Sequence, residues 1–180
     1  MSKKKTSTFY LTERLTMTAS NTPVTGTIDL GAYVDVADRQ AIAIEAVDYI
    51  IQGADANGLP QTVTLSCTGN CSVEAQLSDL NRGGTIQFAD DRALVSSATC
   101  LYSQSNNTAY HSLDMYPDIF GARDGVRLVV NDQLYLTART VGTFQSNETV
   151  DVTVRIKAHV ATLTAKDWMA IAIQSTAADN

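Results

Sequence analysis

The chain has 180 residues, of which 44% are hydrophobic and 18% charged, and its formal net charge is −6 at pH 7. A chain of this length can bury enough apolar surface for one core, which excludes a need for disulfides or metal ions as staples. The acidic balance excludes a broad nucleic-acid-binding face, because such a face needs clustered Lys and Arg to neutralise phosphates.

The N-terminus carries a short basic run, Lys3, Lys4 and Lys5. We assign residues 1–7 to a flexible tail, since chain ends are usually solvated. The alternative is a minimal basic arm that contacts a nucleic acid or an acidic neighbour. No apolar stretch follows that would form a signal peptide or a membrane span, so we expect synthesis in a cytoplasm.

Two-residue alternation of apolar and polar side chains dominates the rest of the chain and predicts strands. Turn-forming Gly, Asn, Ser and Pro separate the segments. Residues 41–52 could form a helix by composition, but their alternation and the lack of a capping signal favour a strand, with Ile42, Ile44, Ala46 and Asp48 on one face. The predicted strands are residues 8–19, 24–30, 41–52, 61–67, 72–77, 85–88, 93–102, 126–130, 133–141 and 150–160.

The clearest alternation lies near the C-terminus, in residues 150–160. Residues 133–141 alternate in the same way, and the polar residues 142–148 between them predict a hairpin. Residues 110–121 contain a proline and lack periodicity, which indicates a long loop with a helical turn. Thr164 and Asp167 have the spacing of a capping box, so residues 165–173 form a short helix or a last strand, followed by a polar tail at 176–180.

Three cysteines are present, Cys67, Cys71 and Cys100. Their odd number and the absence of an export signal argue against a disulfide framework. A bridge between Cys67 and Cys71 across the Gly69–Asn70 turn stays open for a chain that meets oxidising conditions. Structural zinc takes four ligands, and beyond Cys67 and Cys71 only the scattered Cys100, His111 and His159 remain, so no second ligand pair is predicted, and Cys100 fits a small core residue.

No catalytic constellation is recognisable. His111 is expected in a loop and His159 on the exposed side of a strand, and neither has a nucleophile or metal partner in sequence. Neighbouring acids such as Asp35 and Asp38 are interpreted as solvated turn residues, with calcium as the alternative. We therefore predict no enzyme activity, no metal and no cofactor.

These observations predict an all-β fold, an antiparallel two-sheet sandwich covering residues 8–175 with a short C-terminal helix or last strand. Its strand count and the C-terminal hairpin at 133–160 resemble the single jelly-roll capsid proteins of viruses, over residues 8–173. The resemblance implies a structural subunit that self-assembles into a capsid shell, in a virion made in a host cytoplasm. Its partners would be copies of itself and other capsid proteins, with at most weak nucleic-acid contact through the tail.

Aromatic residues in predicted loops are the candidates for interface anchors. They are Tyr102, Tyr110, Tyr116 and Phe120. The alternative function is a non-catalytic β-sandwich module that binds carbohydrate or a host receptor, such as a viral spike, and it would use the same exposed aromatics.

Overall fold

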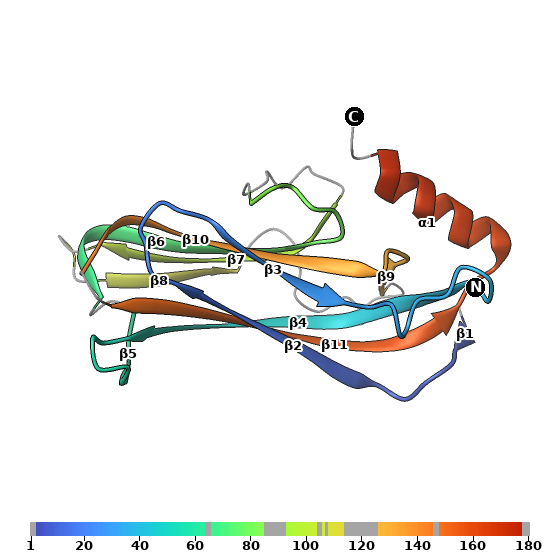
Figure 1. Ribbon diagram of the computed structural model, residues 1–180, viewed down its shortest axis with the longest axis horizontal. Coiled ribbons are helices and arrows are strands. Elements are labelled where there is room, and N and C mark those ends of the chain that lie inside the picture. The colour runs from blue at the N-terminus through green and yellow to red at the C-terminus, as the bar shows by residue number, and fades with distance from the viewer. Residues whose placement is uncertain are drawn as a thin grey trace.

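The backbone forms two antiparallel sheets that lie face to face, with one helix beyond the end of the last strand (Figure 1). The computed structural model describes residues 3–63, 66–84, 93–103, 106, 108–113, 126–145 and 148–177. Sheet A consists of β1 (Lys3–Lys4), β2 (Phe9–Met17), β4 (Gln40–Ala54), β5 (Pro60–Gln61), β9 (Arg127–Val129) and β11 (Thr149–Thr162). Sheet B consists of β3 (Val24–Asp29), β6 (Cys67–Ser78), β7 (Leu94–Ser103), β8 (Thr108–Leu113) and β10 (Gln133–Phe144).

The strand pairing is that of one long hairpin rolled up into two sheets. Four antiparallel pairs succeed each other from the outside of this hairpin to its centre: β2 with β11, β3 with β10, β4 with β9, and β6 with β7. Rolling places the pairs alternately in sheets A and B, which gives the orders β2-β11-β4-β9 and β3-β10-β6-β7. This is the jelly-roll topology. The predicted two-sheet sandwich is therefore confirmed from the pairing itself.

The core fills the space between the sheets. Every second residue of β11 from Val150 to Ile156 is buried there, as the alternation predicted, and the opposite layer comes from β6 and β10, with Leu77, Leu134 and Leu136 fully buried. Burial of such side chains stabilises the fold by roughly 1.5–3 kcal/mol each. The outer faces of both sheets are left to polar residues and to the exceptions described below.

The predicted C-terminal hairpin is wrong. β10 and β11 follow each other in sequence but lie in different sheets: β10 pairs with β3 and β6, whereas β11 pairs with β2 and β4. Alternation shows which face of a strand is apolar, but not which strand lies beside it. The connection after Phe144 crosses from one sheet to the other, because both strands have an apolar face that must meet the opposite layer.

The predicted faces of β4 are wrong beyond residue 44. The pairing with β11 slips between Lys157 and Ala158, so Glu45 and Ala46 together occupy the place of one residue. This β-bulge reverses the alternation, and Val47 joins Ile44 in the core while Asp48 points outward. A period-two pattern cannot reveal an inserted residue when both neighbours are apolar.

The N-terminal segment is attached to the sandwich from residue 3 on, so the predicted tail boundary at residue 8 is too late. Lys3 and Lys4 form β1 opposite Thr162 and Ala161 of β11, and the Lys5 amide donates to the Val160 carbonyl at 2.8 Å. β2 pairs with β11 only as far as Ala158, and β1 continues along the edge that β2 leaves open.

Other local predictions changed when tertiary contacts formed. Of the strand predicted at 61–67, Gln61 lies in β5 and Cys67 begins β6, whereas the other described residues of that range are not in a strand. The turn predicted at 68–70 lies inside β6. The first residues of the loop predicted at 110–121 belong to β8. Residues 114–121 and the strand predicted at 85–88 lie outside the described residues. The last element is a helix, α1 (Ala165–Ala177), whose first turn is capped by the Thr164 hydroxyl, which accepts from the Asp167 amide at 3.2 Å.

Candidate interaction surfaces

Within the described ranges, no three His, Cys, Asp or Glu side chains gather closely enough to hold a metal ion. Asp35 and Asp38, for which calcium was the alternative, make hydrogen bonds within their own turn. Asp35 accepts from the amides of Ala37 and Asp38, and Asp38 accepts from the Gln40 side chain. No helix in the described part of the chain is both long and apolar enough to span a bilayer.

A hollow lies on the outer face of sheet B, at the end where β10 stops. We name it the apolar groove, and its volume is about 570 Å³. Its centre is a row of side chains at one level of the sheet, because Tyr110 pairs with Leu101, Leu101 with Ser72, and Ser72 with Val141. The full lining is Asn70, Cys71, Ser72, Leu101, Tyr102, Ser103, Asn106, Thr108, Tyr110, Val141 and Gly142.

The groove exposes apolar side chains at outer-face positions of the sheet, where polar side chains are expected. Tyr110 is 61% and Leu101 45% exposed. No charged side chain is among the lining residues. The ion pair between Glu74 and Arg139, 2.6 Å apart, lies next to the row, two residues further along β6 and β10. A polar border around an uncharged centre is the composition of a protein interface or a ligand site.

The floor of the groove depends on a close approach of two backbones. Gly142 has φ 101°, and a Cβ at this position would lie 2.5 Å from the Asn70 carbonyl oxygen. The pairing of β10 with β6 shifts between Gly142 and Phe144. Directly opposite, Cys67 and Cys71 are joined by a disulfide, the bridge that the sequence left open. Only glycine can adopt the positive φ of residue 142 and also approach the Asn70 carbonyl oxygen so closely.

Two of the four predicted interface aromatics, Tyr102 and Tyr110, lie at the groove. Tyr102 lies in β7, where a strand was predicted, whereas Tyr110 lies in β8 and not in a loop. The side chain of Tyr110 lies on the outer face of sheet B, whereas Tyr102 is half-buried and packs against the core between the sheets. Tyr116 and Phe120 lie outside the described residues. Leu101 and Val141 were missed as candidates. Both are apolar residues at positions where the alternation calls for polar ones, and this could have revealed them. Leu101, for example, follows the buried Cys100 directly.

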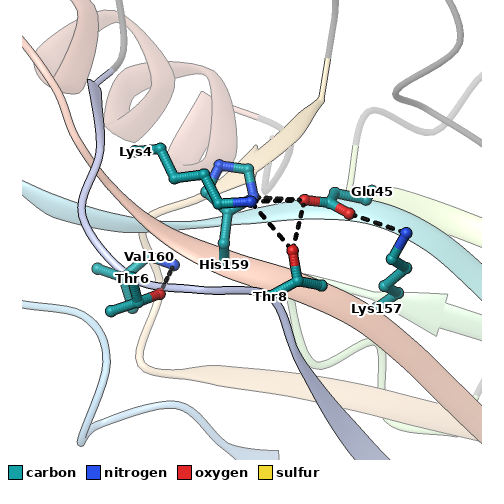
Figure 2. Close-up of polar contacts among 7 residues, drawn as sticks. All are labelled: Lys4, Thr6, Thr8, Glu45, Lys157, His159 and Val160. Carbon is teal, nitrogen blue, oxygen red and sulfur yellow. Dashed lines mark hydrogen bonds and ion pairs between the residues drawn. The ribbon is translucent and has the colours of Figure 1, made fainter.

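A second surface feature is a polar cluster on the outer face of sheet A, centred on Glu45 (Figure 2). Its Oε1 accepts from His159 Nδ1 at 2.8 Å, from Thr8 Oγ1 at 3.2 Å and from Lys4 Nζ at 3.4 Å, while Oε2 lies 3.2 Å from Lys157 Nζ. We call these five residues the Glu45 cluster. It joins the N-terminal segment to β4 and β11.

The bulge in β4 explains why the cluster forms. Its extra residue directs Glu45 outward between Lys157 and His159, which are two residues apart on the outer face of β11. Burial of the carboxylate opposes its ionisation, but the hydrogen bonds from His159, Lys157 and Thr8 outweigh that effect and lower the pKa of Glu45 to about 2. Sequence reasoning missed Glu45 because the bulge is invisible there.

The prediction that His159 is an exposed strand residue is wrong. Its side chain is only 12% exposed, and its Nδ1 lies 2.8 Å from Glu45 Oε1. His111 belongs to β8 instead of a loop. Of the three N-terminal lysines, the structure brings Lys4 into the Glu45 cluster.

The helix α1 presents a third surface. Trp168, Ile171 and Ala172 pack against a small cluster formed by Ala41, Val130 and Leu163. On the other side of the helix, Met169 and Ile173 are 62% and 60% exposed. The helix therefore offers an apolar pair, four residues apart, to the solvent.

No protein-family model matches the chain, and no curated protein matches its sequence. Solved structures of viral coat proteins resemble it in fold. Merkel cell polyomavirus VP1 in complex with 3'-sialyllactosamine matches with a TM-score of 0.47 and 8% identity, covering 90% of this chain and 97% of that chain.

Two further structures illustrate the range of these matches. VP1 of the trichodysplasia spinulosa-associated polyomavirus in complex with GM1 oligosaccharide has a TM-score of 0.41 and 10% identity, over 86% of this chain and 94% of that chain. The structure of Desmodium yellow mottle tymovirus has a TM-score of 0.32 and 4% identity, over 89% of this chain and 93% of that chain. At these scores the similarity adds no argument to the strand pairing, which by itself defines the jelly roll.

Proposed function

We propose that this protein is a structural subunit that associates with copies of itself to form a viral capsid shell. The observation that carries the proposal is the apolar groove, an uncharged row of Tyr110, Leu101 and Val141 on a face of a rigid jelly roll. Large exposed apolar patches on a rigid domain mark contact surfaces.

Low charge supports assembly in particular. Charged groups must lose their hydration when two surfaces meet, and the groove lining contains none. Each contact in a closed symmetric shell need not be large, because every copy makes several of them. The jelly roll supplies the stiffness, since its two sheets share one continuous core.

Size-exclusion chromatography with light scattering, followed by electron microscopy of the same fractions, tests the proposal. We expect the full chain to elute as particles or discrete oligomers, and Leu101→Asp to shift it toward the monomer. The matched control is Ile50→Asp, since Ile50 is 46% exposed on the outer face of sheet A and lies away from the groove. A wild-type chain that stays monomeric at millimolar concentration contradicts the proposal.

A second candidate is a non-catalytic carbohydrate-binding or receptor-binding module. The observation that favours it is the exposed ring of Tyr110 beside the polar groups of Asn70, Asn106 and Thr108, because sugars stack on aromatic rings while amides and hydroxyls bind their hydroxyl groups. A monomer that binds a defined glycan on an array, and loses it in Tyr110→Ala, supports this candidate over the shell subunit.

A further inference from the structure

The helix α1 is apolar on two opposite sides, although it lies on the surface. One side packs on the domain through Trp168, Ile171 and Ala172, and the other exposes Met169, Ala170 and Ile173. The six residues from Trp168 to Ile173 are all apolar, and a helical stretch that is hydrophobic all round is normally buried on all sides. The outer face of α1 therefore calls for a cover that the isolated chain does not provide.

The apolar groove is the surface of matching character, but it lies at the other end of the molecule. The groove is built where β10 ends and the chain crosses to the start of β11, whereas α1 follows the end of β11. β11 runs from one end of the sandwich to the other and ends next to α1 (Figure 1). At about 3.3 Å per residue, its 14 residues span about 46 Å. A chain cannot place its own helix in its own groove.

We propose that the outer face of α1, formed by Met169, Ala170 and Ile173, binds in the apolar groove of a second copy of the chain. The proposal rests on the self-association proposed above and names the two surfaces that meet. Met169 and Ile173 act as anchors at positions i and i+4 of a helix in a groove. They contact the row of Tyr110, Leu101 and Val141.

Charge and size fit this pairing. Met169, Ala170, Ile173 and the lining of the groove are all uncharged, so these groups meet without dehydrating an ion. The exposed Lys166, one turn before Ala170 on the same face of the helix, remains at the rim of the contact, where it keeps its hydration. A hollow of about 570 Å³ lies in the range that accepts a compact group of side chains. The ion pair of Glu74 and Arg139 borders the row and provides a polar rim.

The contact is head-to-tail, because a helix on one copy meets a groove on the next. Each copy then keeps a free helix at one end and a free groove at the other. Such a heterologous contact continues from copy to copy until it closes into a ring, or extends as a filament when it cannot close. A two-fold dimer would instead use the same surface twice.

A mixing experiment tests this directly. The helix variant is Met169→Asp with Ile173→Asp, and the groove variant is Leu101→Asp; all three positions are exposed, so the fold is retained. Circular dichroism and thermal melting verify this, and Ile50→Asp is the matched control. We expect each variant alone to associate at least about 30-fold more weakly than the wild type.

Mixed in equal amounts, the two variants should form a dimer that grows no further. The intact helix of the groove variant fits the intact groove of the helix variant, and the other two surfaces are blocked. Light scattering that shows one-to-one dimers in the mixture supports the proposal. Monomers in the mixture, or variants that assemble like the wild type, overturn it. A wild-type chain that is itself monomeric contradicts the proposed function as well.

Discussion

Replacement of Glu45 by Gln tests how the N-terminal segment is held on the sandwich. The carboxylate accepts from Lys4, Thr8 and His159 through one oxygen and meets Lys157 at the other. Glutamine has nearly the same shape but carries no charge, and its amide nitrogen cannot accept from a lysine. The substitution therefore removes the charge from the centre of the Glu45 cluster without opening a cavity.

The expected loss of stability follows from the pKa. A shift from 4.5 to about 2 corresponds to roughly 3 kcal/mol of preference for the ionised form in the folded state. Because the cluster lies on the sheet surface, with Glu45 19% exposed and Lys4 50% exposed, solvent screening reduces this to about 1–2 kcal/mol. The folded-state pKa is lowered, so this stability is present above pH 4.5 and is lost as the pH falls toward 2.

Urea unfolding of the wild type and of Glu45→Gln measures the difference between their free energies of unfolding. We expect it to shrink from about 1–2 kcal/mol at about pH 5.5 to near zero at about pH 2. Asp48→Asn is the matched control, because Asp48 pairs with Arg155 at 2.9 Å on the same face but both side chains are about half exposed. It should cost less than about 0.5 kcal/mol. A Glu45→Gln difference that does not change over this pH range would refute the reasoning.

Two further substitutions test the floor of the apolar groove. Gly142→Ala should destabilise the fold by about 2–4 kcal/mol in thermal melts, because φ is 101° and the new Cβ would meet the Asn70 carbonyl oxygen; a change within 0.5 kcal/mol contradicts the described backbone approach. Cys67→Ala with Cys71→Ala should cost about 2 kcal/mol, the entropy of a five-residue loop, and should remove the sensitivity of the melting temperature to reductant; Cys100→Ala, with its thiol free and buried, should leave that sensitivity in place.

The candidate surfaces were only partly predictable. Tyr110 was chosen as an exposed aromatic, and it does lie in the groove, but its neighbours Ser72 and Val141 come from β6 and β10, far away in sequence. Which residues stand side by side across a sheet depends on register, and register is fixed by pairing that no local pattern records. The same holds for the Glu45 cluster, which joins residues from three separate segments.

The sequence by itself determined the class of fold and the faces of most strands. In β11, the alternation from Val150 to Ile156 corresponds to the buried side chains, because a strand with one apolar face must turn that face to the core. The start of α1 was also indicated by Thr164 and Asp167, although a last strand stayed open as the alternative, since capping is a local interaction between near neighbours.

The tertiary structure alone decided what pairs with what. Adjacent β10 and β11 separate into opposite sheets, β4 takes up a bulge that turns Glu45 outward, and β1 attaches the lysine-rich start of the chain to β11. Each of these results minimises exposed apolar surface and unpaired backbone over the whole domain at once. That balance is a property of all strands together, so a single segment of the sequence cannot express it.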